Sequence, residues 1–220
     1  MTPPFSKDDV DIIDKQTPFR GYFQVDHYRL KHRLFEGGWS QEMSREIFER
    51  GHAVTALLFD PERDRMVFIE QFRTGAFCAL ATPWFDDSFS PWLVECIAGI
   101  IEEGESPEQV ARRETVEEAG CEITDIVPVC HYLVSPGGST ESVFVFCGRV
   151  DSRDAGGIHG IVEEGENIRV FTVPVAEAMN WLDEGKIANA MTLIALQWFK
   201  LNHEGLRARW LIPKVTDNDP

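Results

Sequence analysis

Residues 99–121 read GIIEEGESPEQVARRETVEEAGC and carry the clearest helix signal in the chain. Ser106 is suited to cap a helix N-terminus, and Pro107 suits the first helical position because its missing N–H is not needed there. Gln109 completes a capping box with Ser106. Gly120 is placed for the left-handed residue that follows a helix. The segment therefore predicts one helix between Ser106 and Gly120.

Three acidic side chains share one face of this predicted helix. Glu114, Glu117 and Glu118 stand at positions i, i+3 and i+4, a spacing that brings their carboxylates within one turn. Like charges at this spacing cost roughly 0.3 kcal/mol per pair unless a positive group lies between them. Arg113 stands four residues before Glu117 and can brace it. An isolated pattern of this kind is more often a solvated acidic face, so the neighbouring residues decide its meaning.

The neighbouring residues resemble the Nudix box, G-x5-E-x7-R-E-U-x-E-E-x-G-U, in which U is a bulky aliphatic residue. All the fixed positions of that pattern are met, by Gly99, Glu105, Arg113, Glu114, Glu117, Glu118 and Gly120. The two U positions hold Thr115 and Cys121, which are smaller than the pattern expects and bear on packing rather than on chemistry. The resemblance implies an α+β fold, namely a Nudix α/β/α sandwich with a mixed β-sheet.

The resemblance also implies a divalent-metal site with two or three Mg²⁺ ions, for which Mn²⁺ can substitute. Carboxylate oxygens are the ligands that such hard cations prefer. The implied ligands are Glu114 and Glu118, with contributions from Glu117, Glu166 and the carbonyl of Ala98. Gly99 is expected to permit a tight turn, and Arg113 to orient the carboxylates as part of the catalytic set. The cations would neutralise a pyrophosphate, activate a water and stabilise the leaving oxygen.

A second resemblance concerns the substrate. Pro136 lies sixteen residues beyond Gly120, a spacing similar to the one that marks ADP-ribose pyrophosphatases among Nudix enzymes. An ordinary Pro-Gly-Gly turn is the alternative explanation. Similarity to the bacterial enzymes extends from about Gly21 to Trp210 and includes Arg45-Glu46-Ile47, Glu70-Gln71-Phe72-Arg73 and Gly157-Ile158-His159-Gly160. It implies Mg²⁺-dependent hydrolysis of the pyrophosphate bond of ADP-ribose to AMP and ribose 5-phosphate.

Two other functions stay open. One is a pyrophosphatase for another nucleoside diphosphate sugar, such as GDP-mannose or ADP-glucose. The other is a Nudix-like module that senses ADP-ribose without cleaving it, which the complete set of box glutamates disfavours. The segment 74–94 is longer than the family's usual connection and carries two aromatic-proline motifs, so it leaves the substrate range open.

The same resemblance implies a set of substrate contacts. Tyr22 would stack on the adenine ring, because its flat face suits a base. Arg45 and Arg73 would bind phosphates, whose oxygens match the guanidinium fork. Glu141, after the Gly-rich turn, is a candidate for holding a ribose hydroxyl. A core aromatic and surface charges are the alternative interpretations of these residues.

A general base must reach the attacking water while the box glutamates hold the metal, so we expect it in another segment. Residues 157–168 offer three carboxylates and three glycines, a composition typical of a lid. A solvated acidic loop is the alternative. By resemblance Glu164 is the base and Glu166 a further metal ligand, with Glu163 as the neighbouring alternative for the base.

The remaining pattern predicts antiparallel strands before the box and two helices at the end of the chain. Residues 1–17 are expected to be a loose arm, and alternation from Phe19 to Arg50 predicts half-exposed strands. Other predicted elements are a hairpin of residues 52–59 and 65–72, strands at 127–134, 142–150 and 168–173, a loop at 151–167, and helices at 174–184 and about 189–202, before Gly205. The predicted domains are an arm with a small N-terminal antiparallel β subdomain for dimerisation (1–50), the Nudix hydrolase domain (51–213) and a polar tail (214–220).

Composition narrows the class of protein. The formal net charge of −16 repels nucleic acid and anionic membranes, so neither is an expected partner. The five dispersed cysteines form no C-x-x-C pair and argue against a disulfide framework or a thiolate zinc site. No signal peptide or run of about 18 apolar residues is visible, so a cytoplasmic protein is expected. The expected partners are the small-molecule substrate and, by the resemblance, a second copy in a homodimer whose N-terminal strands help to build the partner's site.

Overall fold

The structure is a computed structural model that describes residues 5–86 and 88–212, with the side chain of Glu164 outside the described part. These residues divide into two compact units. Residues 5–52 and 132–142 form the first unit, and residues 53–131 and 143–212 form the second.

The first unit is built on an antiparallel sheet. After the short 3-10 helix η1 (Lys7–Asp9), its described strands pair in the order β1 (Val10–Arg20), β2 (Gln24–His32) and β3 (Met43–Glu49). The later segment of the unit joins β3 at Phe48, which pairs with Ser139 and donates its N–H to the Gly138 carbonyl at 2.8 Å. The Pro-Gly-Gly turn therefore lies beside the end of β3.

The expected loose arm at residues 1–17 is wrong for the part described from Phe5 onward. β1 pairs with β2 in a ladder that begins at Val10 opposite His32. Lys15 forms an ion pair with the buried Asp26 at 2.8 Å. The strand is held by backbone hydrogen bonds and this ion pair rather than by burial of apolar side chains. Its sequence consequently lacks the alternation that predicts a strand.

The second unit contains a mixed sheet. Its described strands pair in the order β10 (Gly157–His159), β11 (Ile168–Pro174), β5 (Arg65–Phe72), β4 (Ala53–Asp60), β9 (Ser142–Arg149) and β8 (Asp125–Leu133). Two short strands lie off this path: β6 (Trp92–Glu95) pairs with β5, and β7 (Ile97–Ile100) pairs with β4. β4 and β9 are parallel, whereas β4 and β5 form the predicted antiparallel hairpin. The mixed sheet is thus confirmed.

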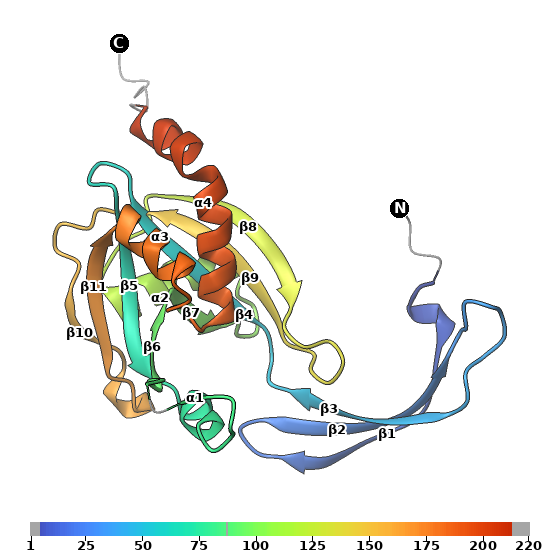
Figure 1. The fold of residues 1–220 in the computed structure, drawn as a ribbon. Helices are drawn as coiled ribbons and strands as arrows, with labels where there is room; N and C mark the ends of the chain where they lie inside the picture. Colours follow the sequence, from blue (N-terminus) through green and yellow to red (C-terminus); the bar gives the residue numbers. More distant parts are fainter. Residues whose placement is uncertain (1–4, 87, 213–220) are drawn as a thin grey trace. The chain divides into compact units, whose positions relative to one another are not determined.

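Helices cover both faces of this sheet (Figure 1). α2 (Pro107–Ala119) packs on one face, and α3 (Val175–Asp183) and α4 (Ala190–Leu211) pack on the other. Alternation along β4 produces the two cores. Val54 shares a buried cluster with Val110 of α2. Phe59 contacts Phe199 of α4, with ring centroids 4.8 Å apart. The predicted α/β/α sandwich is confirmed.

The predicted N-terminal signals of α2 are confirmed. The Ser106 side chain accepts a hydrogen bond from the Gln109 N–H at 3.3 Å, and the Gln109 side chain accepts one from the Ser106 N–H at 2.8 Å. Gly120 follows the helix with a φ of 61°, in the left-handed region. These contacts fix where α2 begins and ends, and therefore which side chains face the sheet.

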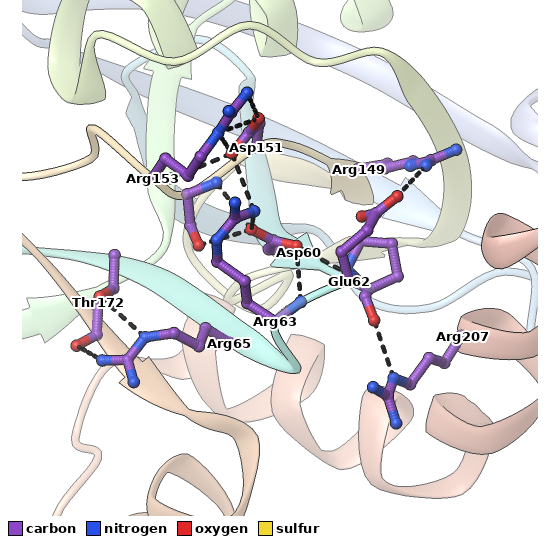
Figure 2. A network of polar contacts seen from close by, with 11 residues as sticks. Asp60, Glu62, Arg63, Arg65, Arg149, Asp151, Arg153, Thr172 and Arg207 are labelled. Carbon is purple, nitrogen blue, oxygen red and sulfur yellow. Dashed lines mark hydrogen bonds and ion pairs between the residues drawn. The ribbon is translucent and has the colours of Figure 1, made fainter.

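The turn between β4 and β5 is held by a polar network (Figure 2). The buried Asp60 accepts hydrogen bonds from the backbone N–H groups of Glu62 and Arg63, both at 3.0 Å. It also accepts from the Arg63 guanidinium at 3.0 Å and from the N–H and hydroxyl of Ser152 at 2.9 and 2.7 Å. Burial alone would raise the pKa of Asp60, but the hydrogen bonds from Ser152 and Arg63 outweigh it and lower the pKa to about 2.

Three other predicted boundaries are corrected. The segment 74–94 contains the short helix α1 (Thr74–Ala79), and the loop at 151–167 contains β10 and the 3-10 helix η2 (Val162–Glu164). α4 continues past Gly205 to Leu211. Glycine costs a helix about 1 kcal/mol, but burial of Leu206 and Trp210 beyond it offsets that cost. None of the described helices combines the length and the apolar composition that a membrane span requires.

Candidate active site

The centre of the candidate site is formed where β7 meets α2. Glu118 is 3% exposed, and its Oε2 accepts a hydrogen bond from the Ala98 N–H at 3.0 Å. Glu114, one helical turn earlier, lies against Gly99, where an added Cβ would be 1.9 Å from Glu114 Oε1. The carboxylate face predicted from the helical spacing is therefore directed at β7.

The tight turn expected at Gly99 is wrong. Gly99 lies inside β7 and pairs with Val54 of β4. It is not among the described glycines with a positive φ. Its missing side chain instead provides the space that the Glu114 carboxylate occupies. Close approach, rather than backbone freedom, explains the glycine.

The pKa of Glu114 is raised to about 7. Burial is the largest cause, because it disfavours the charged form. The charge and hydrogen bond of Arg113 oppose this effect, while the neighbouring carboxylates of Glu117 and Glu166 add to it. The positive charge near Glu114 is thus too small to offset the effect of burial on its pKa.

The pKa of Glu118 is raised further, to about 8, again chiefly by burial. The hydrogen bond from Ala98 and the positive charge of Arg73 work in the opposite direction. The carboxylates of Glu114 and Glu166 repel the charged form. The charges of Glu114, Glu118 and Glu166 therefore act on one another at one place in the second unit.

Arg113 ties the carboxylates of the box together. Its Nε and Nη2 donate to the two carboxylate oxygens of Glu105 at 2.9 and 3.1 Å. Its Nη1 donates to Glu114 Oε1 at 2.8 Å and to Glu117 Oε2 at 3.0 Å. The bonds from Arg113 also lower the pKa of Glu105. The guanidinium consequently fixes the orientation of three carboxylates at once.

The segment after β10 brings Glu166 to this centre. Glu166 Oε2 accepts a hydrogen bond from the Ile161 N–H at 2.9 Å. Gly160 has a φ of +97°, and an added Cβ there would be 2.7 Å from the Glu166 Cβ. Glu163 is exposed on η2, and the side chain of Glu164 lies outside the described residues. Gly160 therefore allows the chain to turn closely around Glu166.

Arg73 follows β5 and lies near Glu118, whose pKa its charge acts to lower. Its Nε donates to Glu95 Oε2 at 2.8 Å. Glu95 ends β6, is 2% exposed and also accepts a hydrogen bond from Asn189 at 2.6 Å. Glu95 and Asn189 were not predicted from the sequence, because neither belongs to a motif and only their tertiary contacts distinguish them.

The other predicted substrate residues belong to the first unit. Tyr22 is 85% exposed, and its ring meets that of Phe23 edge-on with centroids 4.8 Å apart. Arg45 lies in β3 opposite Tyr28. Glu141 is largely buried and forms an ion pair with Arg50 at 3.2 Å. Within this unit, Tyr22 offers an open ring face, whereas Glu141 is already paired.

The residues of the centre fit a hard divalent cation. In the described part of the chain no group of three or more His, Cys, Asp or Glu side chains is arranged to hold an ion, and Arg113 Nη1 instead bonds to both Glu114 and Glu117. The donor atoms are nevertheless carboxylate oxygens, which such cations prefer. Burial and repulsion disfavour the charged forms of Glu114 and Glu118, and a bound cation would relieve both effects. Glu114 and Glu118 would hold it, with Glu117 and Glu166 beside them.

The chain is similar to known proteins over most of its length. Residues 49–196 match the protein family described as the NUDIX domain. The ADP-ribose pyrophosphatase of Escherichia coli strain K12 is 50% identical over 206 residues, which cover 94% of this chain and 95% of that relative. The Haemophilus influenzae protein of the same name is 41% identical over 207 residues, covering 94% and 93%. The GDP-mannose pyrophosphatase of Shigella flexneri is 30% identical over 159 residues, covering 72% and 78%.

A solved structure described as an ADP compounds hydrolase has the same fold. It superposes with a TM-score of 0.66 at 19% identity and covers 90% of this chain and 96% of that chain. The family match includes the whole box and its carboxylates, and the relatives extend over both units. With the box complete at the centre of the second unit, these similarities establish that the chain belongs to the Nudix family.

Proposed function

We propose that this protein hydrolyses the pyrophosphate bond of ADP-ribose to AMP and ribose 5-phosphate, using two or three Mg²⁺ ions for which Mn²⁺ can substitute. The observation that carries the proposal is the pair of the buried Glu118 and the partly buried Glu114, whose charges repel each other in a complete Nudix box. The names of the relatives at 50% and 41% identity support ADP-ribose as the substrate. When bound, the cations neutralise the pyrophosphate and lower the pKa of a water.

The side chains around the carboxylates have separate roles in this proposal. Glu114 and Glu118 hold the cations, and Glu117 and Glu166 complete the acidic surroundings. Arg113 keeps Glu114 in place through its bond at 2.8 Å. Arg73 binds the pyrophosphate oxygens, as a planar guanidinium suits.

Three further residues contact the nucleoside. The exposed ring of Tyr22 stacks on adenine, Arg45 contacts a phosphate, and Glu141 holds a ribose hydroxyl. These assignments come from resemblance to the family. We further propose that two copies form a homodimer in the cytoplasm, in which the N-terminal strands of one copy help to build the site of the other.

Product analysis tests the substrate. The purified protein is incubated with ADP-ribose, GDP-mannose and ADP-glucose, each with Mg²⁺ and with a chelator. We expect AMP and ribose 5-phosphate from ADP-ribose, with the highest kcat/KM of the three and no turnover in chelator. A higher kcat/KM for GDP-mannose would favour the activity named for the relative at 30% identity. Binding of ADP-ribose without any product would indicate a sensing module.

We propose Glu164 as the general base, because the box glutamates are engaged by the cations. Glu164→Gln is expected to lower kcat by about 10²–10⁴-fold while KM changes little. Glu163→Gln, one position away on η2, is the matched control and should keep near wild-type turnover. If Glu163→Gln is the inactive variant, the assignment is off by one residue; if both variants turn over normally, the base lies in another segment.

A further inference from the structure

Arg73 is anchored on one side and open on the other. Its Nε donates to Glu95 at 2.8 Å, whereas its side chain remains 39% exposed. Among the described side chains, which exclude those of residue 87 and Glu164, no acceptor bonds to its Nη1 or Nη2. A guanidinium carries two donor-bearing edges in a fixed plane, so holding Nε fixes the direction in which the Nη edge points.

Glu95 is itself held by a hydrogen bond from Asn189. Its Oε1 accepts a hydrogen bond from the Asn189 side chain at 2.6 Å, while its Oε2 accepts from Arg73. Asn189 is the N-cap of α4, since its own oxygen accepts from the Thr192 N–H at 3.1 Å. Thr192 in turn accepts a hydrogen bond from the buried N–H of Cys96 at 2.9 Å. The N-terminus of a 22-residue helix therefore fixes the carboxylate that holds Arg73.

A charge at 2% exposure is costly unless it is paired and hydrogen-bonded, and Glu95 has both Arg73 and Asn189 as partners. The charge of Arg73 acts on Glu118 of the box. An ion pair that served stability alone could bury the whole Arg73 guanidinium against Glu95. Instead, the Arg73 side chain stays 39% exposed, so its Nη edge can donate to an anion.

We propose that Glu95 is a positioning residue for substrate binding: it holds Arg73 by Nε so that the Nη edge receives the pyrophosphate, with Asn189 supporting Glu95. This inference rests on the proposed function, because it takes Arg73 as a phosphate ligand. Glu95 touches no reacting atom and acts through Arg73 alone.

A double-mutant cycle tests the coupling between Glu95 and Arg73. KM and kcat for ADP-ribose are measured at saturating Mg²⁺ for the wild type, Arg73→Ala, Glu95→Gln and the double variant, together with the Tm of each. We expect Glu95→Gln to raise KM about tenfold with kcat changed less than about threefold, as for a lost charge-assisted hydrogen bond. In the Arg73→Ala background, the same change should leave KM unaltered.

Two further variants separate positioning from stability. Asn189→Ser keeps a residue that caps helices well but removes the amide bound to Glu95, so we expect KM to rise about threefold with little change in Tm. Asp60→Asn is the matched control, because Asp60 is another buried carboxylate that pairs with an arginine. Asp60 lies at the end of β4, whereas Gly99 pairs with Val54 near the start of that strand. It should lower Tm and leave KM unaltered.

The outcomes distinguish this inference from the proposed function. An equal rise of KM for Glu95→Gln in both backgrounds, or no rise in the wild-type background, would overturn the positioning role while hydrolysis of ADP-ribose stands. If the wild type does not hydrolyse ADP-ribose, the proposed function fails. The double-mutant cycle is then measured with the Kd of a non-hydrolysable α,β-methylene analogue of ADP-ribose in place of KM. The same fold-changes are expected, and an equal rise of Kd in both backgrounds, or no rise in the wild-type background, would overturn the positioning role.

Discussion

At the scale of single residues, the site depends on how closely Gly99 and Glu114 approach each other. An added Cβ at Gly99 would be 1.9 Å from Oε1, 2.2 Å from Cδ and 2.4 Å from Cγ of Glu114. All three distances are far inside van der Waals contact. Arg113 Nη1 donates to the same oxygen, Glu114 Oε1, at 2.8 Å. Glu114 therefore has little room to shift without losing its orientation.

We predict that Gly99→Ala impairs catalysis more than folding. The new methyl group must displace the Glu114 carboxylate, and a misplacement of about 1 Å at a reacting centre costs about a hundredfold in kcat. Steady-state kinetics with ADP-ribose and Mg²⁺ give the effect. Gly205→Ala in α4 is the control, because nothing lies within 4 Å of its added Cβ, and it should keep kcat and slightly raise Tm. An undiminished kcat for Gly99→Ala would contradict the account.

The box could be predicted at this scale because its spacing has a direct geometric meaning. Residues at i, i+3 and i+4 share a helix face whatever the rest of the fold is. The role of Gly99 could not be predicted, since it depends on β7 lying against α2. Glu95 was missed for the same reason: its partners Arg73 and Asn189 come from distant segments. The catalytic roles given to Glu164 and the other site residues stay predictions.

At the scale of elements, the β4–β5 hairpin shows how a buried charge can stabilise a turn. Asp60 accepts five hydrogen bonds from Glu62, Arg63 and Ser152, and Arg63 also pairs with Asp151 at 3.1 Å (Figure 2). Arg207 of α4 donates to the Pro61 carbonyl at 2.9 Å in the same turn. The network thus links the hairpin to the loop after β9 and to α4.

We predict that Asp60→Asn lowers the free energy of unfolding by about 3 kcal/mol at pH 7, because an amide cannot accept all the donors that face Asp60. The pKa of Asp60 is about 2 in the folded protein, below its ordinary value of about 3.9. Its contribution is therefore present above about pH 4 and lost as the pH falls through about 2.

Urea unfolding from pH 2 to pH 7 measures this contribution. The difference in stability between wild type and Asp60→Asn should be largest above pH 4 and shrink towards pH 2. A difference that stays constant with pH would mean that the carboxylate charge is not responsible. Turnover of ADP-ribose at pH 7 should be the same for both proteins, because the turn lies away from the box.

Elements with strong local signals were predicted, and those fixed by distant contacts were not. The capping box placed the start of α2, and the hairpin predicted at residues 52–59 and 65–72 corresponds to β4 and β5. β1 was missed because its side chains are mostly exposed and show no alternation. The end of α4 was predicted too early, since Gly205 is a local stop signal that burial of Trp210 outweighs.

At the scale of the whole molecule, the first unit exposes many large apolar side chains on its strands and turns. They include Val10, Ile12, Ile13, Phe19, Tyr22, Phe35 and Phe48. A sheet with apolar side chains and open edges tends to associate with another chain. This exposure supports the proposed homodimer, and the occupant that we propose is a second copy of the chain.

We predict a mass of twice the 25.0 kDa of one chain in light scattering at assay concentration. Ile12→Glu and Phe19→Glu, at positions 58% and 56% exposed, should shift the protein towards monomer and reduce turnover, because each puts a charge on the covered sheet. Leu201→Glu, an exposed apolar position on α4, is the control and should stay dimeric. A fully active monomer of the wild type would rule out a shared site.

The family and the sandwich fold were predicted from the box and its flanking strands, and both are confirmed. Which segments form the first unit could not be predicted from the sequence. Residues 132–142 belong to it through contacts such as Phe48 with Gly138, which join segments far apart in the sequence. Such isolated contacts leave no periodic signal in either segment alone.

The most direct test of the central claim is the kcat of Glu118→Gln for ADP-ribose at saturating Mg²⁺. Glu118 is buried, bonded to Ala98 and directed at the centre of the site, so its charge is needed to hold the cation rather than to fold the chain. Glu103→Gln, an exposed glutamate in the same box, serves as the control. We predict that Glu118→Gln lowers kcat at least about a hundredfold at unchanged Tm or higher, since even the outer partners of metal ligands contribute about 10–100-fold, while Glu103→Gln retains wild-type turnover. Near wild-type turnover of Glu118→Gln would contradict the claim that the Nudix box carboxylates carry the hydrolysis.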